Sequence, residues 1–323
     1  MLKLQGHTVS GISLNPPKKS LFNQSNLSGI LQNDFRINIL NRRKLEQAIN
    51  MIDPDVIVHL AAQPLVLESI NDPIGTFKVN LLGTLNVLES TKSLKKLKAT
   101  LIVTTDKVYK NNPNKIGYIE TDELGGGDPY SASKAAADIA SQVWAKNYAN
   151  SPVAVARAGN VIGGGDWADN RIIPDLARAF NSGKVPKLRN PKSIRPWQHV
   201  LDCLYGYIKL IDYQLDSNSK WCGAWNFGPD FRDKNTVLEL AMEFGKFWGI
   251  SIDIYNNDDT NMTQEVNYLL LNSAKARLGL NWSDQLNFTE SIKWTAEWYL
   301  SSAEKSKEII ENQIYKYFEL RGN

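Results

Sequence analysis

Cysteine and histidine are scarce in this chain of 323 residues, which has two cysteines and three histidines. Cys203 and Cys222 are too few for a disulfide framework, so a reducing cytoplasm is the expected compartment. His7, His59 and His199 lie far apart, and no CxxC or HExxH spacing occurs. We therefore expect no metal site. His59 and Cys203 lie within apolar patterns and are expected to be core residues.

Long apolar runs and blocks of like charge are absent as well. No apolar stretch approaches the roughly 20 residues that cross a bilayer, and residues 1–5 resemble neither a signal peptide nor an anchor. The formal charge of +3 is spread along the sequence, so neither nucleic acid nor a membrane is an expected partner. With 42% hydrophobic and 22% charged residues, the chain is typical of a globular protein.

A glycine loop for dinucleotides is the third absence, since no G-x-G-x-x-G spacing occurs. The glycine run 163–165 follows a predicted strand, but no clear helix begins at its third glycine. The run 125–127 is expected to be a flexible loop. Neither run is expected to hold the phosphates of a dinucleotide.

What is present is an alternation of strand and helix patterns. Three β-branched runs, at residues 55–62, 100–105 and 153–158, are typical of buried strands in a parallel sheet. Helical patterns at residues 43–51, after Asp72-Pro73 and after Pro129-Tyr130 alternate with them. This alternation predicts an α/β fold with a doubly wound, Rossmann-like parallel sheet.

Beyond Ala158 the alternation stops, and all nine tryptophans lie at Trp144 or later, which suggests an aromatic ligand cleft. We expect a strand at 224–227 and helices at 200–213, 236–248, 290–300 and 303–320. Residues 1–165 form the predicted dinucleotide-binding domain, to which residues 196–230 return. Residues 166–195 and 231–323 form a predicted smaller C-terminal substrate domain.

Ligands of open parallel sheets bind at the carboxyl ends of the strands. Three predicted strands end in unusual polar sequence, at residues 61–63, 104–107 and 157–160, and these ends should meet at one crevice. Tyr130 and Lys134 lie four residues apart on a predicted helix and so share a face. The lysine ammonium would lower the pKa of the phenol, and Thr105 would hold the hydroxyl that the phenolate deprotonates. Such a pair by itself is more often an ordinary helix start; the polar strand ends favour catalysis.

Asp106 and Lys107 directly follow the second of these strands. Consecutive charges at such a place commonly form a solvated loop. In an active site, one of them could remove the proton beside a ketone while the other protonates a departing hydroxyl. The residue types leave open which is the acid and which the base.

Seven segments together carry a family resemblance. They are HLAAQPLV (59–66), NLLGT (80–84), TTDKVY (104–109), GGGDPYSASK (125–134), RAGNVIGGGDWADNRIIPD (157–175), NPKSIRPWQHV (190–200) and WNFGP (225–229). On these segments the chain resembles the extended short-chain dehydrogenase/reductase family, and within it the branch that dehydrates CDP-glucose. Lys107 separates that branch from the dTDP-glucose branch, which carries a glutamate there.

The resemblance implies an NAD-dependent enzyme. Hydride would leave C4 of the glucose unit, water would be lost across C5 and C6, and hydride would return to C6 to give CDP-4-keto-6-deoxyglucose. The catalytic residues that it implies are Thr105, Asp106, Lys107, Tyr130 and Lys134. The residues that it implies along the cofactor are Asn15, Asn38, Ala61, Ala62, Gln63 and Asn80, together with Tyr130 and Lys134. The residues that would hold the nucleotide sugar are Asn160, Arg171, Arg195 and Tyr268.

The resemblance also implies a homodimer or homotetramer, joined through the helices after Asp72 and Tyr130. The chain departs from the family pattern at its N-terminal end. Family members open with a strand, a glycine-rich turn and a helix, whereas residues 1–5 correspond to the end of that helix and residues 7–14 to the second strand. Asn15 and Asn38 stand where acidic residues are common.

From this departure we expect the neighbouring strands to lack a partner, NAD binding to be weak and stability to be low. The given sequence is then either incomplete or a degenerate form. Two rival functions accompany the main one. The first is a dehydratase or epimerase of another nucleotide sugar, and the second is an inactive remnant that binds ligands or assembles.

Overall fold

A four-stranded parallel sheet forms the centre of the molecule, for which the computed structural model describes residues 1–112, 114–230, 234–252 and 269–322. Its strands follow the order β3 (Val56–His59), β4 (Ala99–Val103), β5 (Val153–Ala158) and β9 (Gly223–Phe227). Every residue of β5 is buried, as are the first four of β4. The apolar sequence of these strands requires cover on both faces, and the predicted α/β fold is confirmed.

The sheet is interrupted on one side of β3. β1 (Gly11–Ser13) pairs in parallel with β2 (Asp34–Arg36) as a separate two-stranded sheet. Within the described ranges, β1 and β3 have no strand between them and do not pair with each other. The residues of β3 other than His59 are half-buried, so the expectation of a buried strand was wrong here. The expected loss of a strand partner is confirmed.

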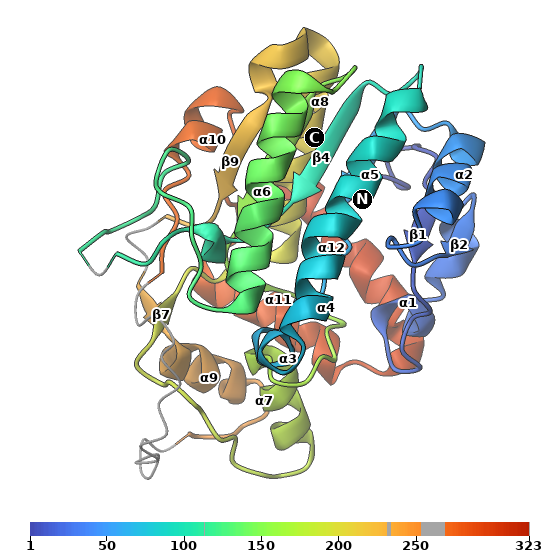
Figure 1. Ribbon diagram of the computed structural model, residues 1–323. Coiled ribbons are helices and arrows are strands. Elements are labelled where there is room, and N and C mark those ends of the chain that lie inside the picture. The colour runs from blue at the N-terminus through green and yellow to red at the C-terminus, as the bar shows by residue number, and fades with distance from the viewer. Residues whose placement is uncertain (113, 231–233, 253–268, 323) are drawn as a thin grey trace.

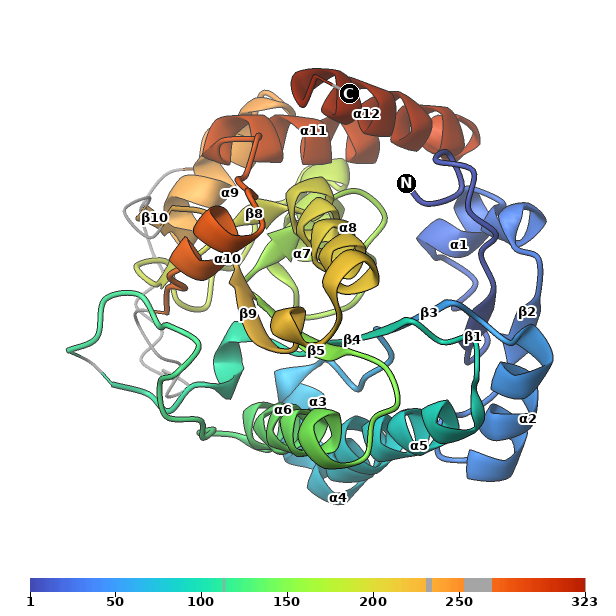
Figure 2. The ribbon, with the colours of Figure 1, turned by 90° about the horizontal axis from the view of Figure 1, so that it is seen from above.

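Helices cover the two faces of the four-stranded sheet (Figure 2). One face carries α6 (Pro129–Asn147) and a segment made of α4 (Pro73–Phe77), a π-helical turn (Lys78–Leu82) and α5 (Gly83–Ser90). The other face carries α8 (Val200–Ser217). α2 (Arg42–Ile52) packs on α5, and α3 (Val66–Asn71) leads into α4. No helix in the described part of the chain is long and apolar enough to span a bilayer.

The remaining helices lie mostly beyond the carboxyl ends of the strands (Figure 1). They are α7 (Ile172–Asn181), α9 (Val237–Lys246), α10 (Ala274–Gly279), α11 (Phe288–Leu300) and α12 (Ser306–Leu320). Two short sheets join them, β6 (Val161–Ile162) with β8 (Gln198–His199), and β7 (Ile194–Arg195) with β10 (Asn235–Thr236). α1 (Leu21–Gln24) reaches across to this half, where Gln24 accepts a hydrogen bond of 2.8 Å from the Trp167 indole.

Most described tryptophans belong to the core rather than to a cleft. Trp221, Trp225 and Trp282 are buried in the apolar cluster beneath α8, while Trp298 is buried in a second cluster between α7, α9 and α11. The aromatic cleft suggested by their distribution was therefore largely wrong, because these indoles fill the volume between helices. His59 and Cys203 are buried as expected.

Candidate active site

The carboxyl end of β4 places three of the predicted catalytic residues in one short turn. Thr105 caps the 3-10 turn Asp106–Val108, and its hydroxyl accepts a hydrogen bond of 3.3 Å from the Lys107 amide. The same hydroxyl donates to the Asp106 carboxylate at 2.9 Å. The turn keeps the Asp106 side chain inside the protein, so the consecutive charges are not a solvated loop.

Asp106 is 2% exposed, and its Oδ2 atom has no hydrogen-bond partner among the residues that the structure describes. Burial raises the pKa of this carboxyl, while Lys107, the Thr105 hydroxyl and Arg195 act in the opposite direction. Burial is the largest of these influences, because a carboxylate without water or enough donors is costly. Asp106 therefore has the character of a proton donor.

Helix α6 brings Tyr130 and Lys134 to the same place. Asp128 caps its first turn by accepting a hydrogen bond of 2.9 Å from the Ser131 amide, and Pro129 fits the first helical position. Tyr130 lies beside Thr105, whose side chain acts to lower the pKa of the Tyr130 hydroxyl. The Lys134 ammonium donates to the Val103 carbonyl at 2.7 Å, which fastens α6 to the last residue of β4.

The pKa of Tyr130 is raised rather than lowered by the protein alone, and the expected effect of Lys134 on it stays a prediction. Burial raises the pKa of Tyr130 to about 12, and Asp106 acts in the same direction, against Thr105 and Arg171. Lys134 points to a backbone carbonyl instead, and burial lowers its own pKa to about 8 despite the nearby Asp138. A reactive phenolate here needs more positive charge than the protein alone supplies.

Two of the predicted substrate residues are arginines close to this centre. Arg195, at the end of β7, is 5% exposed and acts electrostatically on Asp106. Arg171 precedes α7, pairs with Asp166 at 3.0 Å and acts on Tyr130. Both positive groups therefore face the predicted catalytic residues from the second half of the chain.

The other two predicted substrate residues are Asn160 and Tyr268, of which the structure describes only Asn160. Asn160 is half-buried after β5, and its carbonyl accepts a hydrogen bond of 3.1 Å from the Gln198 amide. Tyr268 lies outside the described residues.

The loop after β3 carries the predicted cofactor residues Ala61, Ala62 and Gln63, all half-buried. Asn80 supports this loop from below: its Oδ1 accepts from the Gln63 amide at 2.8 Å, and its Nδ2 donates to the Ser133 hydroxyl at 2.9 Å. Asn80 is 1% exposed, so the structure gives it a supporting place between the loop and α6.

Asn15 and Asn38 follow the carboxyl ends of β1 and β2, and both are exposed. The Asn38 side chain accepts a hydrogen bond of 2.9 Å from the Leu40 amide and so forms a local turn. Like the loop after β3, these two positions follow the carboxyl ends of strands. They belong to the separate β1–β2 sheet, on the other side of the interruption. Their contact with a cofactor stays a prediction.

The glycine runs do not supply a phosphate cradle. A Cβ atom at Gly164 would overlap the Trp298 indole, and one at Gly126 would overlap the backbone of Ala132 in the first turn of α6. Gly126 and Gly164 thus allow close packing, and residues 125–127 form a loop before α6 as expected. The residues present thus fit the reactive end of a nicotinamide dinucleotide, through Thr105, Tyr130 and Lys134, and offer no glycine loop for its phosphates.

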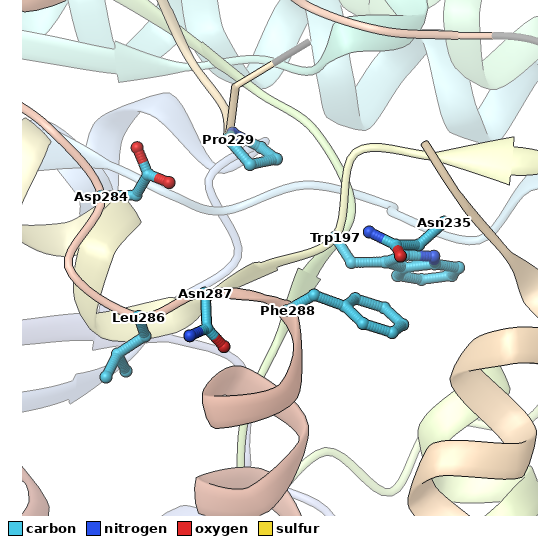
Figure 3. A pocket seen from close by; sticks show the side chains of 7 residues that line it. All are labelled: Trp197, Pro229, Asn235, Asp284, Leu286, Asn287 and Phe288. Carbon is cyan, nitrogen blue, oxygen red and sulfur yellow. The ribbon is translucent and has the colours of Figure 1, made fainter. Parts of the chain in front are cut away.

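A small cleft lies in the second half of the chain (Figure 3). Its lining residues are Trp197, Pro229, Asn235, Asp284, Leu286, Asn287 and Phe288. Asn235 pairs with Arg195 across the β10–β7 ladder, and the buried indole N–H of Trp197 has no hydrogen-bond partner. The cleft is therefore next to a predicted substrate residue, although none of the predicted catalytic side chains lines it.

The sequence analysis missed one buried group at this site, the ion pair of Asp138 and Arg157. Two signals pointed to it: Asp138 continues the spacing of Tyr130 and Lys134 by one more helical turn, and Arg157 interrupts an otherwise apolar strand. A search for metal ligands gave nothing in the described ranges, where no group of three or more His, Cys, Asp or Glu residues could hold an ion.

Comparisons with known proteins identify the family. A model of the NAD dependent epimerase/dehydratase family matches residues 1–221. The chain belongs to this family. It is 37% identical over 306 residues to the CDP-glucose 4,6-dehydratase of Salmonella typhimurium, covering 91% of this chain and 85% of that protein. It is 25% identical to the dTDP-glucose 4,6-dehydratase of Haemophilus influenzae, covering 84% of this chain and 83% of that protein.

Solved structures of this epimerase/dehydratase type share the fold. The UDP-glucose 4-epimerase of Thermotoga maritima superposes with a TM-score of 0.79 at 20% identity, covering 92% of each chain. The dTDP-glucose 4,6-dehydratase of Bacillus anthracis, solved with NAD, gives a TM-score of 0.74 at 24% identity, covering 95% of this chain and 92% of that one. At these identities the likeness concerns the fold.

Proposed function

We propose that the chain is a CDP-glucose 4,6-dehydratase that uses NAD. Similarity to the Salmonella enzyme over nine-tenths of the chain supports the substrate. The observation that carries the proposal is the buried Asp106 carboxyl, which lies beside Lys107 and shares Thr105 with Tyr130. A buried acid next to an oxidation site is the equipment for eliminating water beside a new ketone.

In the oxidation half, Tyr130 takes the proton of the C4 hydroxyl, and Thr105 holds that hydroxyl in line. The chemistry that a bound NAD supplies is acceptance of hydride from C4 and its later return to C6. Lys134 fixes the helix that carries Tyr130 by its bond to the Val103 carbonyl. The positive charge that this tyrosine needs comes from Lys134, Arg171 and the oxidised cofactor together.

In the elimination half, the C4 ketone acidifies the proton at C5. Lys107 removes that proton, and Asp106 gives its proton to the hydroxyl that leaves C6 as water. We assign the acid to Asp106 because burial raises the pKa of its carboxyl, so that it keeps a proton to donate. The two groups are adjacent in one turn, which suits removal and donation at neighbouring carbons.

For binding, we propose that Asn160, Arg171 and Arg195 hold the diphosphate, since guanidinium forks match phosphate oxygens well. The proposed cofactor contacts run through Asn15, Asn38, Ala61, Ala62 and Gln63, with Asn80 behind them. The cofactor half then comprises residues 1–165 and 196–230, and the substrate half 166–195 and 231–323. That β9 joins β5 and α8 covers β4 supports this division.

We also propose a cytoplasmic homodimer or homotetramer. Ile74, Leu82, Ile139 and Val143, on α4, the π-helical turn and α6, are 49–65% exposed. α4 and the turn contact α6, so these apolar side chains share one side of the sheet. An exposed apolar face of this kind suits a second copy of the chain.

Turnover of defined substrates tests the proposal. The purified chain is incubated with NAD and CDP-glucose, and mass spectrometry follows the loss of one water from the nucleotide sugar. In deuterium oxide the product should carry deuterium at C5, because the base exchanges its proton with solvent. UDP-glucose and dTDP-glucose serve as comparisons, and Tyr130→Phe is the inactive control. Water loss only from UDP- or dTDP-glucose would instead support the rival dehydratase.

A further inference from the structure

Asp138 and Arg157 form an ion pair in the interior, with side chains 0% and 1% exposed. Arg157 Nε and Nη2 each donate a hydrogen bond of 2.8 Å, one to each oxygen of the Asp138 carboxylate. A two-pronged pair of this geometry fixes both side chains in direction as well as distance. Burial at this level is costly unless all remaining atoms are satisfied.

The remaining atoms bond to the surroundings of the site. Thr104 donates to Asp138 at 3.0 Å, and Gln142 donates to the other carboxylate oxygen at 2.7 Å. Arg157 Nη1 donates to the Tyr109 hydroxyl at 2.9 Å, and Tyr109 donates onward to Asn226 at 2.7 Å. The pair thus joins α6, β4, β5 and the segment just after the Asp106–Val108 turn.

The position of Asp138 relates this pair to catalysis. Tyr130, Lys134 and Asp138 follow one another at intervals of four on α6 and share a face. Lys134 bonds to the carbonyl of Val103, and Asp138 to the hydroxyl of Thr104. Two consecutive residues at the end of β4 are therefore clamped to α6, directly before Thr105.

We propose that Asp138 and Arg157 are positioning residues for the dehydratase site: they clamp α6 to the end of β4, and Asp138 supplies the negative charge that faces the Lys134 ammonium. This inference rests on the proposed function for its link to catalysis. The clamp stands on the hydrogen bonds of Lys134, Asp138 and Arg157 alone, and the counter-charge on the four-residue spacing of Lys134 and Asp138 on α6. Neither residue touches the reacting atoms, so both act through Lys134, Tyr130 and Thr105.

The charges around Lys134 make Asp138 the deciding partner. The titratable or charged groups on elements packed about it are His59 on β3, Asp106 and Lys107 in the turn after β4, Arg157 on β5, and Tyr130 and Asp138 on α6. Burial holds His59 neutral and raises the pKa of Asp106. Asp138 is the group that opposes the effect of burial on Lys134.

The test compares Asp138→Asn with Tyr109→Phe. Both disturb the same buried network, but only the first removes charge. The titration of Lys134 is followed by NMR of chains labelled at lysine Cε, with Lys134→Met to assign the signal. We expect its pKa to fall by about one unit in Asp138→Asn and to stay unchanged in Tyr109→Phe. The alkaline limb of the kcat profile should move to lower pH in the same variant only.

Two further variants keep the proposal testable if Asp138→Asn does not fold. If the unpaired Arg157 prevents Asp138→Asn from folding, the double variant Asp138→Asn/Arg157→Gln removes both charges. It should show a downward shift in the pKa of Lys134 that is smaller than the shift from removing Asp138 alone. Thr104→Val removes one clamp without changing charge, and should lower kcat at least threefold while the Lys134 titration is unchanged. An unshifted Lys134 in a folded Asp138 variant would overturn the proposal. If neither Asp138 variant folds, the test depends on Thr104→Val. A wild-type kcat in that variant would then overturn the proposal.

The readouts also separate this inference from the proposed function. If the wild-type chain does not dehydrate CDP-glucose, the proposed function fails, yet the NMR titration still reports whether Asp138 faces Lys134. If the chain is active and the titration of Lys134 ignores Asp138, the inference fails and the proposed function stands.

Discussion

At the scale of single residues, the site joins groups whose proton affinities burial has raised. The pKa values of Asp106 and Tyr130 are both raised, and reduced contact with water is the largest cause for each. For Asp106, which is fully buried, this suits the role of an acid. For Tyr130, which is half-buried, it opposes the role of a base, so Lys134, Arg171 and a charged cofactor must restore reactivity.

Replacing Tyr130 by phenylalanine tests the proposed base. Removing the hydroxyl should lower turnover of CDP-glucose by about 10²- to 10⁴-fold, the usual contribution of a general base. The thermal midpoint should change little, because the phenyl ring keeps the packing of this half-buried side chain. Steady-state kinetics and circular dichroism measure the two effects. Turnover within threefold of wild type would remove Tyr130 from the mechanism.

Buried histidines make stability depend on pH. Burial lowers the pKa of His59 and of His199 to about 3, from 6.5. Between those values the unfolded chain binds more protons than the folded one, so the free energy of unfolding rises with pH. The contribution of the two neutral histidines to the free energy of unfolding is fully present above pH 6.5. It is lost as the pH falls from 6.5 towards 3, at about 1.4 kcal/mol per pH unit for each histidine.

The variant His59→Gln isolates one of the two histidines. His59 Nε2 lies 3.0 Å from the Thr84 hydroxyl, and a glutamine amide can keep a hydrogen bond there. Urea unfolding from pH 7 to pH 5 should show about half the histidine-dependent slope in this variant. An unchanged slope would mean that His59 gains its proton without unfolding.

At the scale of elements, the β3 strand differs from its neighbours. It is paired on one edge only in the described ranges, and its residues are less buried than those of β4 and β5. Strand edges without partners leave backbone groups open to water and to other strands. The loop at 61–63, which follows β3, is therefore attached to the least protected strand of the sheet.

Hydrogen exchange tests this weakness. The amides of β3 that point away from β4 should exchange at least tenfold faster than the amides of β5, which is paired on both edges. The measurement is mass spectrometry or NMR of the chain in deuterium oxide without ligands. Equal protection of β3 and β5 would show that some other segment covers the free edge in solution.

At the scale of the whole molecule, the exposed apolar face on α4 and α6 predicts self-association. Ile139 and Val143 are each 50% exposed at adjacent turns of α6. Changing both to lysine should convert the assembly to monomers in analytical ultracentrifugation, because charges cannot be buried in an apolar interface. The matched control is Leu278→Lys on α10, which is 88% exposed and should leave the assembly unchanged. A monomeric wild-type chain would contradict the prediction.

Local sequence pattern was enough for several features of this protein. Alternating strand and helix signals predicted the α/β class, and the polar strand ends predicted that residues 104–107 lie at the candidate site. The four-residue spacing of Tyr130 and Lys134 placed both on one face of α6. The unpaired edge of β3 in the described residues also matches an expectation drawn from the family pattern.

The electrostatics and the supporting contacts depend on the fold of the whole chain. No sequence pattern says how far Asp106 and Tyr130 are shielded from water, and this shielding is the largest cause of their raised pKa values. Asp138 on α6 pairs with Arg157 on β5, 19 residues further along the chain. The spacing of residues within a single helix or strand cannot predict such a contact. The same holds for Arg195, whose effect on Asp106 arises because the second half of the chain folds back over the end of β4.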